Sequence, residues 1–275
     1  MIDLHSHTTA SDGQHSPDEL LALAAQAGVK ALAVTDHDTV AGLAGASAAA
    51  LRFGIELVAG IELSAFLDNR EVHVLGHFVD PASDELRSFS ALLKTERASR
   101  MEAMVVKMNG LGYPITMADV LAIAGEAQLG RPHLARALVE RRFCSSTKDA
   151  FDRFLGAGKQ AFVDRYRLSC EEAIALIDRA GGVATVAHPG VSRIEKMDLS
   201  RLKAVGLTGL EVYHPDHVPS AREKFLGFAR SLELIPTAGS DFHGEKVAPG
   251  RALGAATMPP MEFQALRQRA RAPAA

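Results

Sequence analysis

The sequence predicts an α/β fold in which a helical segment interrupts an alternation of strands and helices. Short apolar runs typical of buried strands alternate with amphipathic stretches near both ends of the chain, whereas residues 100–165 show only helical periodicity. Several predicted strands end in polar residues, as in β/α barrels whose sites lie at the carboxyl edge of the strands. We therefore expect residues 1–99 and 166–275 to form the barrel and residues 100–165 to form an inserted helical cap.

The first predicted strand, residues 1–7, ends in His5 and His7. Residues two apart in a strand point to the same side, so both imidazoles could bind one cation. Asp12 follows in the next loop and offers a carboxylate oxygen. Two histidines at this spacing often occur by chance, so the pattern predicts a metal site only if other ligands join it.

The elements that follow are marked by caps and periodicity. Ser16 and Pro17 provide a cap and a first position for a helix that ends at Gly28. Next we expect a strand at 31–35, a helix at about 40–53, and strands at 55–62 and 71–79. In the last of these strands the alternation places His73 and His77 on one face.

The cap begins within a long helix predicted from 83 to 111, whose apolar stripe includes several methionines that core packing explains. Shorter helical pieces are expected after Thr116, Pro132 and Thr147. Alternation then resumes with a helix at 169–180, strands at 183–187, 209–213 and 234–238, and an amphipathic helix after Pro259.

Polar residues follow several of these strands. Any one of them could be a helix cap or a solvated side chain, but their agreement indicates one shared site. They are Asp36, His37, Glu62, His188, Asp241 and His243.

Composition restricts the classes of function. The formal net charge of −3 gives no general attraction to nucleic acid or to an anionic membrane, so any phosphate must be held by local charge. No apolar run approaches the roughly 20 residues of a membrane helix, and no basic and apolar leader precedes Asp3. The chain has only two cysteines, Cys144 and Cys170, which lie far apart and form no Cys-x-x-Cys pair. Because this pattern is typical of proteins in a reducing compartment, we expect a cytoplasmic protein.

Taken together, these motifs resemble the PHP (polymerase and histidinol phosphatase) family of metal-dependent phosphoesterases. The resemblance implies a distorted (β/α)7 barrel of the PHP type that holds up to three divalent ions. The matching stretches are residues 3–7, 11–13, 35–38, 60–64, 72–76, 187–190 and 239–243.

The same resemblance implies which residues hold the ions. It assigns His5, His7, Glu62 and Asp241 to one ion, Glu62, His73 and His188 to a second, and Asp12, His37 and His243 to a third. Imidazole and carboxylate ligands suit Mn²⁺, Fe²⁺ or Zn²⁺ better than Mg²⁺. Some family members carry His where this chain has Asp12, and the harder ligand favours Mn²⁺. His77 stands where an aromatic or apolar residue is expected; it either joins the site or supports a ligand from behind.

Within the family, the chain most resembles enzymes that remove the 3′-phosphate from nucleoside 3′,5′-bisphosphates, which are related to enzymes that trim short 5′-phosphorylated RNA. The features that carry this resemblance are residues 130–136, the turn at 211–217 and the overall size. They imply conversion of pAp to AMP and phosphate, with 5′-to-3′ trimming of short RNA as a second activity. Because no nucleophilic Ser, Cys or Asp stands in a recognisable motif, we expect a metal-bridging hydroxide to attack phosphorus directly.

Other residues are expected to contact the substrate. His217 is the predicted proton donor or phosphate ligand. Arg131 and His133 are the first choices for a second phosphate, because a guanidinium matches phosphate oxygens two at a time, and Lys159 and Arg193 are weaker choices. Neither a membrane nor a stable protein partner is implied.

Two alternatives remain open. One is another phosphomonoesterase of the family, such as a histidinol phosphatase, although an amino alcohol phosphate calls for an acidic pocket residue rather than Arg131. The other is a non-catalytic PHP module, which the complete set of expected ligands disfavours.

Overall fold

The chain forms two compact units. The computed structural model describes residues 1–125 and 129–270. Unit 1 comprises Met1–Ser90 together with Arg167–Ala275, and unit 2 comprises Ala91–Tyr166. Each unit has its own apolar core.

Unit 1 is built on a single sheet. In spatial order its strands are β1 (Ile2–Asp3), β2 (Ala31–Val34), β3 (Glu56–Leu67), β4 (Arg70–His77), β6 (Val183–Val186), β7 (Gly209–Tyr213) and β8 (Ile235–Ala238), with β5 (Leu168–Ser169) beside β3. Neighbouring strands are parallel except on the two sides of β4. Hydrogen bonds from Leu4 N to Ala238 O (3.0 Å) and from Asp241 N to His5 O (2.9 Å) join the first strand to the last. The sheet is therefore a nearly closed barrel, which confirms the predicted fold class.

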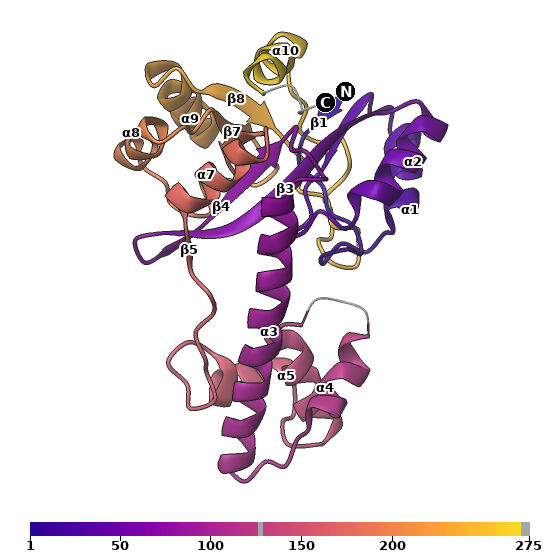
Figure 1. The fold of residues 1–275 in the computed structure, drawn as a ribbon, viewed down its shortest axis with the longest axis vertical. Helices are drawn as coiled ribbons and strands as arrows, with labels where there is room; N and C mark the ends of the chain where they lie inside the picture. Colours follow the sequence, from indigo (N-terminus) through magenta and orange to yellow (C-terminus); the bar gives the residue numbers. More distant parts are fainter. Residues whose placement is uncertain (126–128, 271–275) are drawn as a thin grey trace. The chain divides into compact units, whose positions relative to one another are not determined.

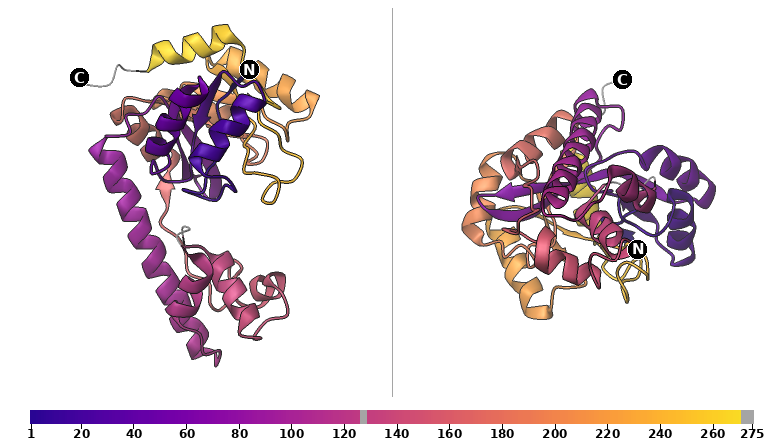
Figure 2. Two further views of the ribbon diagram at one scale, coloured as in Figure 1. Left: turned by 90° about the vertical axis from the view of Figure 1, so that its right-hand side faces the viewer. Right: turned by 90° about the horizontal axis from the view of Figure 1, so that it is seen from below.

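Helices cover the sheet on two sides. Figures 1 and 2 show α1 and α2 on one side and α7, α8 and α9 on the other. The helices of unit 1 are α1 (Pro17–Gln26), α2 (Leu43–Phe53), α7 (Cys170–Arg179), α8 (Lys196–Ala204), α9 (Pro219–Ser231) and α10 (Pro260–Arg269). The sequence analysis did not predict α8 or α9, each of which buries two residues.

The predicted helix start at Ser16 is present. The Ser16 hydroxyl accepts the Glu19 N–H at 3.3 Å, and the Ser16 N–H donates to the Glu19 carboxylate at 2.8 Å. This reciprocal pair satisfies two backbone donors that the helix leaves open. It fixes where the chain turns back after the loop that carries Asp12.

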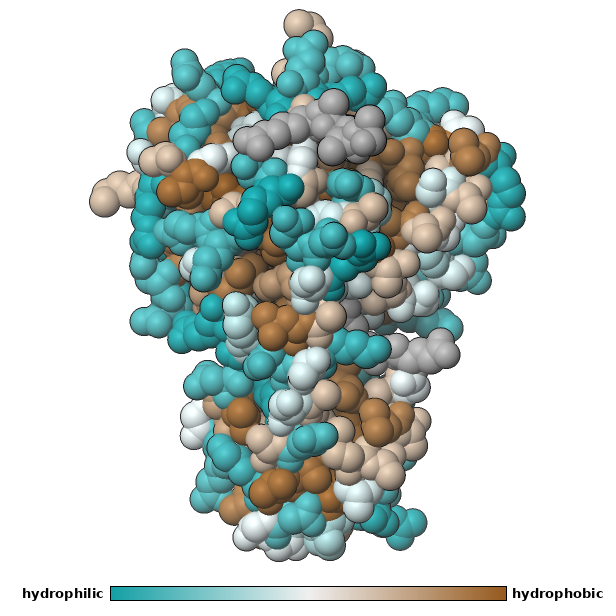
Figure 3. All heavy atoms as spheres, viewed as in Figure 1, coloured by the Kyte–Doolittle hydropathy of each residue, from teal (hydrophilic) through white to brown (hydrophobic). Residues whose placement is uncertain are grey.

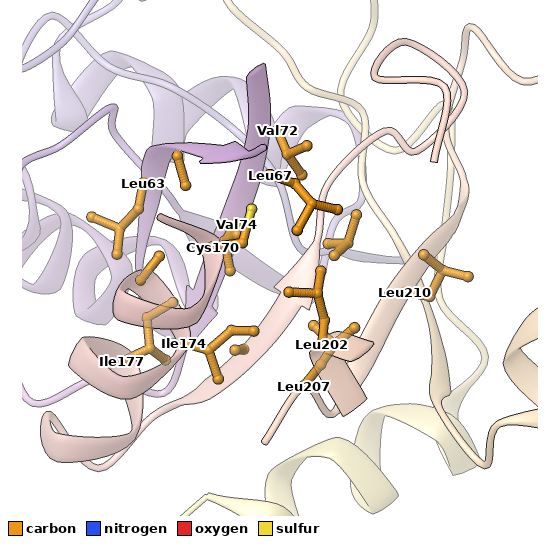
Figure 4. Close-up of a cluster of buried hydrophobic side chains, with 14 of the residues drawn as sticks. Leu63, Leu67, Val72, Val74, Cys170, Ile174, Ile177, Leu202, Leu207 and Leu210 are labelled. Carbon is orange, nitrogen blue, oxygen red and sulfur yellow. The ribbon is translucent and has the colours of Figure 1, made fainter. Parts of the chain in front are cut away.

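The larger core packs α7 against the long strands β3 and β4 (Figure 4). Val72 and Val74 lie in this core with Ile174 and Ile177, and all four are at most 1% exposed. Alternation along β4 turns His73 and His77 to the opposite face. One face of the strand thus holds the core while the other carries histidines.

Unit 2 is helical and contains most of α3 (Asp84–Gly110). The other helices are α4 (Met117–Ala124), α5 (Arg131–Glu140), α6 (Thr147–Ala150) and the π-helical turn η1 (Phe151–Leu155). Met101, Met104 and Met108 are buried with Leu134 and Leu138, which confirms core packing for these methionines.

Among residues 1–125 and 129–270, no helix is both long and apolar enough to cross a bilayer. On the face drawn in Figure 3, apolar side chains are interspersed with hydrophilic ones over both units. Long α3 carries many charged side chains, which explains why its length alone does not make it a membrane span.

We predict that Ile177→Ala lowers the free energy of unfolding by about 2–5 kcal/mol, because it opens a cavity between α7 and the sheet. Urea denaturation followed by circular dichroism measures this. Met261→Ala is the control, since Met261 is 84% exposed and its truncation should change stability by less than about 0.5 kcal/mol. Equal effects of the two substitutions would contradict the described core.

Candidate metal centre

The predicted metal ligands gather at one edge of the barrel of unit 1. Each comes from a strand or from the loop that follows one: His5, His7 and Asp12 from β1 onward, His37 after β2, Glu62 in β3, His73 in β4, His188 after β6, and Asp241 and His243 after β8. The barrel therefore brings together residues that are up to 238 positions apart in the chain (243 − 5).

The centre of the site is the Glu62 carboxylate, which is fully buried. Imidazole nitrogens from five different histidines surround its two oxygens. Their distances are 3.2 Å for His5, 3.1 Å for His7, 3.2 Å for His37, 2.8 Å for His73 and 3.1 Å for His188. A carboxylate in this position can be shared between two cations.

Within residues 1–125 and 129–270, three groups of side chains lie close enough to hold an ion. The first contains His5, His7, Glu62 and Asp241, which are the members of the first predicted ligand set. The second contains His37, Glu62 and His73, with His188 also bonded to Glu62. The third contains Asp12, His37 and His243 and adds His7. His37 thus stands between the second and third groups.

Buried ring nitrogens provide a test of whether the residues suit a metal. Among the described residues, neither nitrogen of His7 has a hydrogen-bond partner of acceptable geometry, although its ring is fully buried. Its Nε2 nevertheless faces oxygens of Glu62 and Asp241 at 3.1 and 3.3 Å. Buried polar atoms normally find partners. A cation among these atoms would satisfy them, and the mixture of imidazole and carboxylate suits a divalent transition metal.

The carboxylates also set the pKa values of the histidines. Burial disfavours the charged form of His73, but Glu62 outweighs it and raises the pKa of His73 to about 10. Burial likewise acts against His7, yet Asp241 and Glu62 raise its pKa to about 9. Burial, with the neighbouring His7 and His73, lowers the pKa of His37 to about 4 despite the Glu62 charge. Protons and divalent ions therefore compete for the same nitrogens.

The histidines in turn lower the pKa values of the carboxylates. Burial raises the pKa of Glu62, but the surrounding histidines hold it well below its usual range. Burial also opposes ionisation of Asp241, and His5, His214 and His7 more than compensate, so its pKa is lowered. Both carboxylates are therefore anionic near neutral pH and available to a cation.

Asp36 holds the loop that carries Asp12. Its carboxylate accepts the Thr8 N–H, the Thr8 hydroxyl and the Ser11 hydroxyl, each at 2.7 Å. These bonds fix the turn from which Asp12 reaches to within 3.3 Å of His243 Nε2. Asp12 itself is 56% exposed, so the turn rather than burial determines its position.

Sequence reasoning missed three residues behind the ligands. Glu211 accepts a hydrogen bond from His5 Nδ1 at 3.0 Å. Arg251 contacts Asp241, and His214 Nε2 lies 3.5 Å from the same carboxylate. One signal was available: Glu211 is a charged residue inside an otherwise apolar strand. Nothing comparable in the sequence marks Arg251, which lies in a loop.

His77 lies behind the ligands rather than among them. Its ring is fully buried, and Nε2 donates to the Leu4 carbonyl oxygen at 2.9 Å. Within the described part of the chain, it belongs to none of the three groups that could hold an ion. Burial lowers its pKa to about 4. His77 therefore supports, as a neutral side chain, the strand that presents His5.

His217 is 2% exposed, and both of its ring nitrogens are engaged. Nδ1 donates to the Val212 carbonyl oxygen at 2.9 Å, and Nε2 accepts the Gly190 N–H at 3.2 Å. These partners fix a neutral tautomer. His217 could donate a proton to a substrate only if one of these two hydrogen bonds broke. Its role as proton donor therefore stays a prediction.

The residues expected to bind a second phosphate fall in both units. In unit 2, the Arg131 guanidinium lies 5.6 Å from the ring centres of Phe151 and Phe162 and donates to the Leu155 carbonyl oxygen. His133 follows in the same helical turn, and its Nδ1 accepts the Gly130 N–H at 3.1 Å. Lys159 is an exposed residue of unit 2. Arg193 is exposed and belongs to unit 1.

Arg131 is one of several guanidinium groups near one another in unit 2. Burial and the charges of Arg131, Arg165 and Arg97 together lower the pKa of Arg100 to about 10, although Asp164 acts in the opposite direction. Four arginines of unit 2 therefore lie close enough to act on one another, and Asp164 partly offsets their charge.

Comparison with known proteins identifies relatives along nearly the whole chain. The PHP domain family matches residues 3–180. A "5′-3′ exoribonuclease" of Haemophilus influenzae is 36% identical over 88% of this chain and 89% of its own. A "3′,5′-nucleoside bisphosphate phosphatase" of Chromobacterium violaceum is 34% identical over 90% of this chain and 88% of its own.

A solved structure has the same fold. It is a protein of Bifidobacterium adolescentis described as a metal-dependent phosphoesterase, with a TM-score of 0.81 and 33% identity. The match covers 98% of this chain and 96% of that one.

We predict that His77 makes the metal-free protein less stable as the pH falls from 6.5 toward 4. Unfolded histidine takes up a proton near pH 6.5, whereas folded His77 does so only near pH 4. In this window the unfolded state binds more protons, so this residue contributes a loss of about 1.4 kcal/mol per pH unit.

Urea denaturation at several pH values, compared with His77→Gln, isolates this contribution from the other titrating groups. Glutamine has no titratable group, so the free energy of unfolding of the variant should fall less steeply as the pH decreases. If the free energy of unfolding of the two proteins depended on pH in the same way, the described environment of His77 would be contradicted.

Proposed function

This chain belongs to the PHP domain family and is a metal-dependent phosphoric ester hydrolase, and we propose that it removes the 3′-phosphate from nucleoside 3′,5′-bisphosphates. The observation that best supports this substrate is that the chain carries two kinds of anion-binding chemistry. One is the cluster around Glu62, where bound cations would contact a phosphoryl group, and the other is the group of arginines around Arg131. A bisphosphate offers one anionic group for each.

In this proposal, His5, His7, Glu62 and Asp241 would hold one Mn²⁺ ion, and Glu62, His73 and His188 would hold a second. Asp12, His37 and His243 hold a third. When bound, such ions supply a water of lowered pKa and neutralise charge on the phosphoryl oxygens. The residues have to present unprotonated imidazoles, and the outer contacts of His5 and Asp241 keep them oriented.

Arg131 binds the second phosphate of the substrate in this proposal. Its guanidinium is planar and offers several N–H donors in a fixed fork, and the rings of Phe151 and Phe162 limit its movement. A phosphate would also offset the mutual repulsion among Arg131, Arg100 and Arg165. His133, in the same helical turn, is a second contact, and Lys159 and Arg193 remain weaker candidates because both are exposed.

The same chemistry extends to short 5′-phosphorylated RNA. The first nucleotide of such an RNA carries a 5′-phosphate and a phosphoryl group on its 3′-oxygen, as a nucleoside 3′,5′-bisphosphate does. Hydrolysis of the bond between phosphorus and the 3′-oxygen releases a nucleoside 5′-monophosphate in both cases. We therefore propose 5′-to-3′ trimming as a second activity, in line with the exoribonuclease relative.

We predict that the Mn²⁺-loaded protein releases phosphate from adenosine 3′,5′-bisphosphate with a kcat/KM at least about tenfold higher than from 3′-AMP, which lacks the 5′-phosphate. Charged hydrogen bonds contribute about 1.5–3 kcal/mol each, which corresponds to at least this factor. The assay is phosphate release, with 5′-AMP and histidinol phosphate tested in parallel; activity on a short 5′-phosphorylated RNA is measured as release of nucleoside 5′-monophosphate. Preference for histidinol phosphate would replace the proposed substrate with the alternative one.

Arg131→Ala should lower kcat/KM for the bisphosphate by about 10- to 100-fold and leave 3′-AMP hydrolysis unchanged. Arg136→Ala is the matched control, because Arg136 is exposed on the same helix. An equal loss on both substrates would show that Arg131 acts on the fold rather than on the second phosphate.

His5→Ala or Asp241→Ala should abolish turnover, because each removes a ligand beside Glu62. Circular dichroism checks that the fold is kept, and bound manganese is measured in the same samples. Full activity in either variant would refute the proposed site.

A further inference from the structure

Glu211 is an unusual residue for its place in the barrel. It lies in the middle of strand β7, whose other residues are Gly, Leu, Val and Tyr, and it is fully buried. A buried carboxylate is costly unless hydrogen bonds compensate for the loss of water. The hydrogen-bond partners of Glu211 therefore indicate why a carboxylate is buried in this strand.

Both oxygens of Glu211 bond to residues of the proposed metal centre. Oε1 lies 3.0 Å from His5 Nδ1, and Oε2 accepts the backbone N–H of His188 at 2.7 Å. His5 and His188 belong to different proposed ion sites, which share Glu62. One carboxylate thus holds a residue of each site.

The bond to His5 determines which ring nitrogen faces the cluster. In the neutral ring, a carboxylate that accepts from Nδ1–H favours the tautomer whose Nε2 carries no proton, and Nε2 is the nitrogen directed at Glu62 and Asp241. Glu211 thus favours the tautomer of His5 that can bind a cation.

The bond to His188 stabilises an uncommon backbone conformation. His188 has a φ of +25°, which is rare for a residue other than glycine. Surrounding contacts have to maintain such a conformation, and a charge-assisted N–H···O⁻ bond is a strong one. The His188 ring reaches Glu62 Oε1 at 3.1 Å from this backbone position.

A glycine next to the pair shows how closely the chain packs around it. A Cβ atom at Gly239 would lie 2.2 Å from the His5 Cβ and 2.7 Å from Glu211 Oε1. The chain after β8 therefore passes directly against this hydrogen bond and shields it.

We propose that Glu211 is a positioning residue that sets the metal affinity of both the His5 site and the His188 site. It acts through the ring of His5 and the backbone of His188 rather than by touching the substrate. This inference rests on the proposed metal centre. Carboxylates that orient ligand histidines in this way typically change metal affinity by about 10- to 100-fold.

The test is Glu211→Gln, measured by equilibrium dialysis against Mn²⁺ and by the Mn²⁺ concentration that half-activates phosphate release. Glutamine is nearly the same size, but its amide can accept only one of the two bonds and turns an NH₂ group toward the other donor. We expect Mn²⁺ to bind about 10- to 100-fold more weakly, with kcat at saturating Mn²⁺ within a few-fold of the original protein. A variant that is merely misfolded would not recover at high Mn²⁺.

Glu223→Gln is the matched control, since Glu223 is exposed on α9 and the substitution removes the same charge. It should bind Mn²⁺ as the original protein does. Unchanged Mn²⁺ affinity in Glu211→Gln would overturn the inference while the metal centre stands. Absence of Mn²⁺ binding by the original protein would instead refute the metal centre on which the inference rests.

Discussion

The buried carboxylate of Glu62 is the interaction on which the rest of the site depends. Its two oxygens lie within 3.2 Å of nitrogens from five histidines that come from separate parts of the barrel. Taking such a group out of water costs several kcal/mol unless charges or hydrogen bonds replace the solvent. The nearly closed sheet makes this replacement possible, because it directs the ends of β1, β2, β6 and β8 toward the position of Glu62 on β3.

A second layer of polar groups holds the histidines and carboxylates in place. Asp36 fixes the loop of Asp12, Glu211 fixes His5 and His188, and Arg251 contacts Asp241. Without cations, protons occupy part of this cluster, since the carboxylates raise the pKa of His7 and His73. Metal binding and proton release are therefore coupled in this site. The arginines of unit 2 supply charge of the opposite sign to the carboxylates and suit an anionic substrate.

Periodicity predicted the alternation of strands and helices and the helical insertion, because it reports local structure directly, whereas the barrel was implied by the resemblance to the PHP family. The sequence also singled out the residues that meet at Glu62, since each lies in or shortly after a recognisable strand. It did not reveal α8 or α9, nor did it reveal Arg251, whose role depends on where a loop closes. The hydrogen bonds of His217 could not be foreseen either, because they depend on how the turn after β7 packs against Gly190.

The most direct test of the account is X-ray diffraction at the manganese absorption edge from crystals of this protein grown with Mn²⁺. The account predicts anomalous density beside Glu62, within bonding distance of His5, His7 and Asp241, and a second peak on the side of His73 and His188. Anomalous density elsewhere, or none at Glu62 in crystals that contain manganese, would contradict it.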